Sequence, residues 1–194
     1  MQASQGVMQL IGQLIIFVLG VIGLNLAQAE PIRIVCFGGS NTYGKNLARE
    51  DAYPAQLQAL LRANGYDVVV SNQGTNGQTT FDEVTKLNSA VPEGTAIVIF
   101  QPGGNDRRKG GNTEDNIRTI VQALLNRNIG VIFSGSGTKQ KIVESFDVLK
   151  INELSHLAPD DMQGDREHLT PQGYGIVANR LLLLIEKLIR KTRM

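Results

Sequence analysis

Short β-rich segments alternate with helix-length amphipathic segments from residue 32 to residue 190, and this alternation most strongly limits how the chain can fold. Such alternation is typical of a parallel sheet whose crossover helices cover both faces. The sequence therefore predicts a three-layer α/β/α sandwich around a central sheet of about four or five parallel strands. The strands are expected at Ile32–Phe37, Val68–Asn72, Ala96–Gln101 and Ile129–Ser134.

Helices are expected where apolar residues recur at helical spacing. The last one, Thr170–Arg190, has the clearest signals, because Thr170 suits a cap and Pro171 a first turn. Residues 135–164 are weakly patterned, and one helix is expected there near Lys141–Phe146. The other expected helices are Tyr53–Asn64, Phe81–Leu87 and Asn116–Asn126.

An apolar N-terminal segment precedes the first predicted strand. Residues 10–26 are almost entirely apolar, and no charged residue occurs before Glu30. Ala27-Gln28-Ala29 has the small-x-small pattern that signal peptidase recognises. We therefore expect residues 1–29 to be a signal peptide or, if uncleaved, a signal anchor that tethers the chain to a membrane through residues 10–26. The protein is then periplasmic or secreted, or is held at the inner membrane.

Composition argues against several classes of protein. Nineteen basic and 18 acidic side chains leave a net charge of +1, so no strong field favours a nucleic-acid partner. The single cysteine, Cys36, excludes an internal disulfide and lies in a predicted strand, where a buried thiol is the simplest interpretation. A chain of 194 residues has room for one domain of ordinary size.

Polar, glycine-rich clusters follow three of the predicted strands, at residues 38–44, 72–79 and 103–106. The carboxyl ends of parallel strands meet at one edge of an open sheet, where ligands bind. Asp165 and His168 stand just before the last predicted helix and are expected to join the same edge. The sequence therefore predicts a single site at that edge.

The four polar segments resemble, in order, the four sequence blocks of the SGNH/GDSL hydrolase family. The resemblance covers residues 32–190 and is closest to the compact bacterial lysophospholipase, thioesterase and arylesterase branch. It implies a hydrolase domain over residues 30–194 that cleaves small-molecule esters or thioesters. The matching segments are Phe37-Gly38-Gly39-Ser40-Asn41-Thr42, residues 72–79, Gly103-Gly104-Asn105-Asp106 and Asp165-Arg166-Glu167-His168-Leu169-Thr170.

Serine chemistry explains why these residue types are needed. Ser40 is a weak nucleophile at neutral pH and requires a base to take its proton, for which His168 is the candidate. Asp165, three residues earlier, can face the same way and hold the imidazole in the required tautomer. The resemblance assigns the oxyanion donors to the backbone N–H groups of Ser40 and Gly77 and to the Asn105 amide. This mechanism requires neither a cofactor nor a metal ion.

Two features of the sequence leave the substrate open. Position 39 is glycine where the commonest form of the family carries aspartate, and residues 106–164 contain no recognisable lid. Arg107, Arg108 and Lys109 follow the third block and have two interpretations. They form a solvated basic turn, or they line the mouth of the site and attract an anionic headgroup or leaving group.

Other functions stay open at this point. A carbohydrate O-acetylesterase would use the same site, and Gly39 is the one feature that favours a catalytically inactive, tethered binding protein. Gly39 to Asn46 is also one residue short of a phosphate-binding P-loop, although Asn46 stands where Ser or Thr must bind magnesium. A metal site is the remaining alternative, although its residues lack a recognised ligand spacing. Its ligands would come from His156, Asp160, Asp161, Asp165 and His168.

Overall fold

A five-stranded parallel sheet, in the order β2-β1-β3-β4-β5, forms the centre of the protein. The computed structural model describes residues 30–192. The predicted α/β fold with a parallel sheet is confirmed. The strands are β1 (Ile32–Gly38), β2 (Val68–Gly74), β3 (Thr95–Gln101), β4 (Gly130–Ser134) and β5 (Leu149–Ile151).

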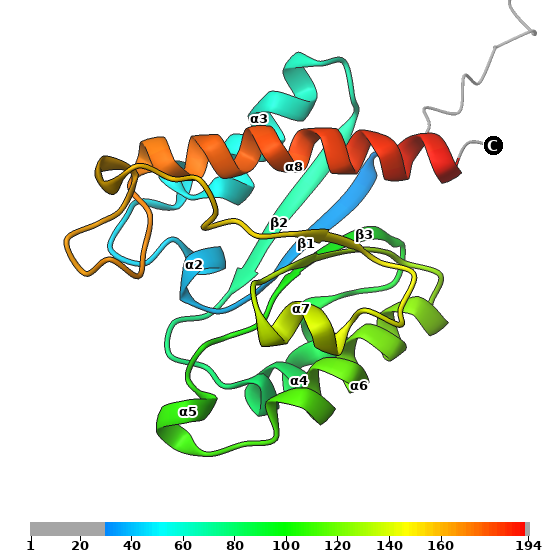
Figure 1. Ribbon diagram of the computed structural model, residues 1–194. Helices are drawn as coiled ribbons and strands as arrows, with labels where there is room; N and C mark the ends of the chain where they lie inside the picture. Colours follow the sequence, from blue (N-terminus) through cyan, green and yellow to red (C-terminus); the bar gives the residue numbers. More distant parts are fainter. Residues whose placement is uncertain (1–29, 193–194) are drawn as a thin grey trace, which may run out of the picture. The chain divides into compact units, whose positions relative to one another are not determined.

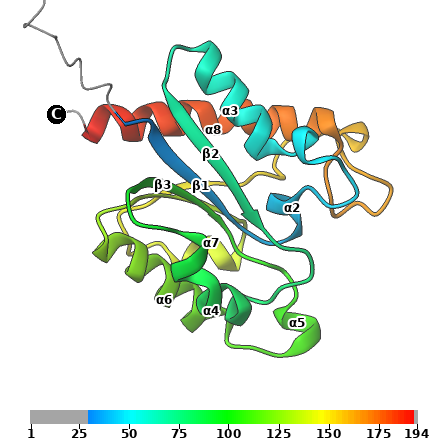
Figure 2. The ribbon, with the colours of Figure 1, turned by 180° about the vertical axis from the view of Figure 1, so that it is seen from behind.

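Helices cover both faces of this sheet (Figures 1 and 2). One face carries α3 (Tyr53–Ala63) and α8 (Pro171–Thr192), and the other carries α4 (Thr80–Ala90), α6 (Thr113–Asn126) and α7 (Thr138–Ile142). The remaining helices are short and lie in loops. They are α2 (Ser40–Tyr43), α5 (Asp106–Lys109) and the 3₁₀ turns η1 (Arg49–Asp51) and η2 (Pro159–Asp161).

Strand β1 shows why the central strands are continuous apolar runs. Ile34 and Cys36 point into the core under α3 and α8, whereas Val35 and Phe37 point into the core under α4 and α6. Both faces of the strand are therefore buried, as expected for a parallel sheet covered on two sides. Burial of the Cys36 thiol raises its pKa to about 12, so it is an inert core residue.

The strand order places a topological switch point between β1 and β3. After β1 the chain crosses to β2 on one side, and it then returns to β3 on the other side of β1. The loops that leave β1 and β3 therefore diverge and open a crevice at the carboxyl edge of the sheet. Ser40 follows β1 and Asn105 follows β3, so the fold brings these two residues to that crevice.

The structure differs from the prediction between β4 and α8. The expected helix at Lys141–Phe146 is instead α7, Thr138–Ile142, which begins directly after Gly137 with its φ of 56°. The chain then forms the short strand β5, which the sequence did not predict.

The predicted leader, residues 1–29, lies outside the described residues, and its role stays a prediction. Within residues 30–192 no helix is both long enough and apolar enough to cross a membrane.

Candidate active site

Ser40, His168 and Asp165 form a hydrogen-bonded chain at the carboxyl edge of the sheet. Ser40 begins α2 directly after β1, and its Oγ lies 2.8 Å from Nε2 of His168. Nδ1 of His168 lies 2.6 Å from Oδ2 of Asp165. The imidazole is buried, with 3% of His168 exposed. The structure therefore brings together the three residues predicted to form a triad, over a separation of 128 residues between serine and histidine.

Asp165 is held as a carboxylate. Its Oδ1 accepts hydrogen bonds from the backbone N–H groups of Glu167 and His168, each at 3.0 Å. The N–H of Glu167, followed by the His168 side chain, lowers the pKa of Asp165 to about 2. Because the carboxylate is charged at neutral pH, it accepts a hydrogen bond from Nδ1–H of His168, and Nε2 is free to accept the Ser40 proton.

Gln163 fixes the hairpin that carries His168. Its backbone N–H donates to the carbonyl of His168 at 2.7 Å, and its side-chain Nε2 donates to the carbonyls of Leu169 at 2.7 Å and Lys45 at 2.9 Å. Asn46 in turn donates to Oε1 of Gln163 at 3.1 Å. The histidine hairpin is therefore attached directly to the segment that follows α2.

Asn41 makes a second connection between nucleophile and base, one that the sequence analysis missed. Its Nδ2 donates to the carbonyl of Glu167 at 3.2 Å, and its Oδ1 accepts from the Tyr174 hydroxyl at 3.3 Å. Asn41 adjoins Ser40, and Glu167 adjoins His168. The contact therefore links the segment that carries Ser40 to the segment that carries His168.

The three predicted oxyanion donors face one cleft. Ser40, Gly77 and Asn105 line a cleft of about 590 Å³ together with His168. Gly77 has a φ of 72°, a conformation that favours glycine. The Asn105 amide donates to the carbonyl of Gln78 at 3.1 Å, which fixes its orientation. The amide nitrogen carries a second proton, so one donor remains for a ligand.

Close packing explains the glycine at position 39. A Cβ atom there would lie 2.9 Å from Cα of Gly103, so an aspartate does not fit without a shift of the two loops. The backbone N–H of Gly39 donates to the carbonyl of Gln101 at 3.1 Å. The departure from the commonest family pattern is therefore a packing feature at the switch point, and it no longer favours an inactive scaffold.

The basic segment 107–109 is a short helix, α5, and its side chains diverge. Arg107 lines the cleft of the predicted oxyanion donors and also a second cleft, of about 450 Å³, that Ser40 and His168 line as well. Arg108 lies 3.4 Å from Glu167, an exposed pair that contributes little to stability. Lys109 does not line these clefts, and its ammonium group donates to the carbonyl of Gly77 at 2.7 Å. It therefore supports the loop that carries Gly77, one of the predicted oxyanion donors.

The phosphate-binding alternative does not fit the structure. Ser40 begins a one-turn helix that ends at Tyr43, and Asn46 has a φ of 66°. The next longer helix, α3, begins only at Tyr53. Lys45 therefore does not stand at the start of a helix whose N–H groups would bind phosphates.

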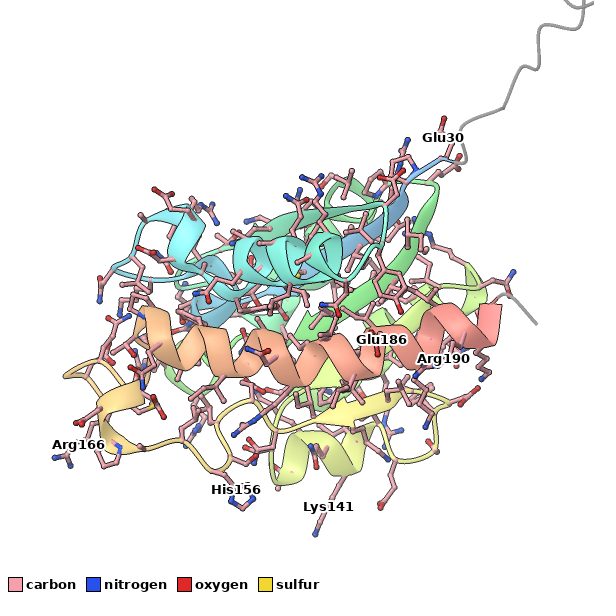
Figure 3. All side chains as sticks on the ribbon, turned by 90° about the horizontal axis from the view of Figure 1, so that it is seen from above. Glu30, Lys141, His156, Arg166, Glu186 and Arg190 are labelled. Atoms are coloured by element: carbon pink, nitrogen blue, oxygen red, sulfur yellow. The ribbon has the colours of Figure 1, made fainter. Side chains whose placement is uncertain are left out.

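The metal alternative also lacks a suitable arrangement. Among residues 30–192, no group of three or more His, Cys, Asp or Glu side chains is placed to hold a metal ion. His156 and Arg166 both point outward from the segment between β5 and α8 (Figure 3). His156 therefore does not join the acidic side chains of this segment around a common centre.

An α/β fold with a serine, a histidine and a carboxylate joined at the switch point of a parallel sheet defines a hydrolase of the serine type. The sequence matches the model of the GDSL-like lipase/acylhydrolase family over residues 36–151, more than half of the chain. The chain belongs to that family and is an ester-hydrolysing enzyme, so the predicted family is confirmed. Asp165 and His168 lie beyond the matched residues. No curated protein sequence matches the chain.

Solved structures show the same fold. Esterase EstA from Pseudoalteromonas sp., inhibited by monoethylphosphonate, superposes with a TM-score of 0.71 at 17% identity, over 81% of this chain and 98% of its own. TesA superposes with a TM-score of 0.72 at 19% identity, over 80% of this chain and 99% of its own. A family 3 carbohydrate esterase of Clostridium thermocellum superposes with a TM-score of 0.71 at 20% identity, over 83% of this chain and 98% of its own.

Proposed function

We propose that the protein hydrolyses carboxylic esters or thioesters of small molecules through an acyl-enzyme on Ser40. The observation that carries this proposal is the hydrogen-bonded chain from Ser40 Oγ through His168, at 2.8 Å, to Asp165, at 2.6 Å. Ser40 attacks the acyl carbon while His168 takes its proton, and Asp165 stabilises the imidazolium that forms. His168 then returns the proton to the leaving alcohol or thiol. Water releases the acyl group by the same steps.

The oxyanion forms in the cleft that the backbone N–H groups of Ser40 and Gly77 and the Asn105 amide share. Hydrogen-bond donors already held in place stabilise this charge without reorganising during the reaction. Each such donor is typically worth about 3 to 4 kcal/mol of transition-state stabilisation.

The lining of the site favours a short acyl group and a polar leaving group. A cleft of about 450 Å³ lies beside Ser40 and His168, and Pro102 and Leu154 are the two apolar side chains among its described lining residues. A long acyl chain gains about 0.8 kcal/mol for each CH₂ it buries against apolar surface, and this cleft offers little. Its polar side chains include Gln101, Ser134, Lys139, Asn152 and Glu153.

The same lining supports a second candidate, a carbohydrate O-acetylesterase. Ser134 donates to the carboxyl group of Glu153, and both residues are buried where they line the cleft. Asn152 adds an amide that both donates and accepts. Such alternating donors and acceptors suit the hydroxyl groups of a sugar. Lysophospholipids, with a long acyl chain, fit this cleft least well among the substrates of the compact bacterial branch.

A panel of p-nitrophenyl esters tests the proposal. We expect turnover of the acetate and butyrate esters, and a kcat/KM at least about tenfold lower for octanoate and dodecanoate, because longer chains find no apolar wall. An acyl thioester, a lysophospholipid and an acetylated sugar complete the panel. A neutral ester and a matched carboxylate-bearing ester test whether Arg107 binds anionic substrates. If it does, KM is lower for the carboxylate-bearing ester than for the neutral one. A preference for dodecanoate and the lysophospholipid would contradict the short-acyl assignment.

A further inference from the structure

A buried carboxyl group lies beneath the loops that carry the oxyanion donors. Glu83 on α4 is fully buried, and its Oε1 accepts the backbone N–H of Gly103 at 2.8 Å and the side-chain Nε2 of Gln78 at 3.1 Å. The same Nε2 also donates to the carbonyl of Gly38 at 2.7 Å. A single oxygen atom is therefore connected to the loops that follow β1, β2 and β3.

Each of these connections ends within two residues of a predicted oxyanion donor. Gln78 directly follows Gly77, and its own carbonyl accepts the Asn105 amide at 3.1 Å. The other two residues of the network are Gly38, two residues before Ser40, and Gly103, two residues before Asn105. Movement of this buried group would therefore displace all three donors together.

The turn after β3 is also held by Lys139. Nζ of Lys139 donates to the carbonyls of Pro102 at 3.0 Å and Gly103 at 2.9 Å. Gly103 has no room for a side chain, because a Cβ there would lie 2.6 Å from the carbonyl oxygen of Gln78. The turn that leads to Asn105 is thus fixed at its N–H group, at its carbonyls and by close packing.

The carboxyl group is mostly neutral near pH 7. Burial raises the pKa of Glu83 to about 8, against the lowering effects of the Gly103 N–H, Gln78 and Lys139, and the charge of Asp106 raises it further. The other carboxyl oxygen, Oε2, has no hydrogen-bond partner among the described residues. Oε1 thus behaves as a carbonyl oxygen that accepts two N–H groups, and a glutamine presents the same oxygen.

We propose that Glu83 is a positioning residue that holds the three oxyanion donors in their catalytic arrangement through Gln78 and the N–H of Gly103. The inference rests on the proposed function of the site. Donors must lie about 3 Å from the developing oxyanion, and a misplacement of about 1 Å can cost about 100-fold in rate. Because these donors act on the transition state, loss of the connection lowers kcat and leaves KM largely unchanged.

Three variants test this role. Glu83→Leu removes the acceptor at similar volume, and kcat for p-nitrophenyl acetate is expected to fall about 10- to 100-fold with KM within about twofold. Glu83→Gln keeps Oε1 and is expected to restore kcat to within about threefold of wild type. The control, Thr95→Val, removes the partly buried hydrogen bond from the Thr95 hydroxyl to the Pro92 carbonyl, 2.7 Å, at the opposite end of β3. It should lower the melting temperature and leave kcat unchanged.

The outcomes separate this role from the hydrolase assignment. Wild-type kcat in folded Glu83→Leu, or failure of Glu83→Gln to restore kcat, overturns the positioning role. If Glu83→Leu does not fold, Gln78→Met breaks the same network with Glu83 in place: a lower kcat at unchanged KM supports the role, and an unchanged kcat overturns it. Absence of ester hydrolysis and of fluorophosphonate labelling in the folded wild type instead contradicts the proposed function.

Discussion

Replacing His168 with alanine is expected to lower kcat by about 10⁴- to 10⁶-fold, because Ser40 loses the base that takes its proton. Nε2 of the imidazole lies 2.8 Å from the serine oxygen. The Asp165 carboxylate cannot replace it as the base, because it contacts the other ring nitrogen, Nδ1, on the side of the imidazole away from Ser40. The residual rate comes from the oxyanion donors and from substrate binding. The fold should remain intact, because Gln163 and Asp165 hold this hairpin through backbone atoms of residue 168.

Steady-state hydrolysis of p-nitrophenyl acetate, with circular dichroism to confirm folding, measures this effect. His156→Asn is the matched control, since His156 is the one other histidine of the chain and is exposed. Asparagine tolerates its φ of 52°. The control should retain wild-type kcat. Turnover by the His168 variant within tenfold of wild type would remove histidine from the mechanism.

Replacing Asn105 with alanine is expected to lower kcat about 10²- to 10³-fold with little change in KM, because one oxyanion donor is lost. One amide proton is used by the Gln78 carbonyl at 3.1 Å, and the other remains for the oxyanion. The effect is smaller than that of the histidine because the backbone N–H groups of Ser40 and Gly77 remain.

Asn76→Ala is the control for the oxyanion assignment, since Asn76 lines the same cleft and is not among the predicted donors. Its kcat should stay close to that of wild type. Equal losses in the two variants, or a loss confined to KM in Asn105→Ala, would argue that Asn105 binds substrate and does not stabilise the transition state.

Much of the fold was predictable because burial on both faces leaves a strong pattern. Apart from Arg33 and Gln101, the runs at Ile32–Phe37 and Ala96–Gln101 are apolar, and they form β1 and β3, two of the three interior strands. β5 was missed because three residues with one exposed side chain carry no periodic signal. Helices α4 and α6 begin earlier than expected because Thr79 and Asn112 cap them.

The candidate triad could be predicted because acyl transfer requires particular side chains, whereas the groups that hold these side chains in place could not. Gln78, Glu83 and Lys139 are residue types that usually face solvent. Glu83 lies on α4 and is buried, and its carboxyl group accepts the N–H of Gly103, which is 20 residues further along the chain. Asn41 adjoins the nucleophile, but its partner in the histidine hairpin is 126 residues away.

The whole mechanism depends on the hydroxyl group of Ser40 as the nucleophile, and covalent labelling tests this role most directly. A fluorophosphonate is incubated with the folded protein, and the modified peptide is identified by mass spectrometry. We predict one adduct, on Ser40, that is absent from a folded Ser40→Ala variant. A folded wild-type protein that takes up no label, or a label that persists in Ser40→Ala, would contradict an acyl-enzyme at this position.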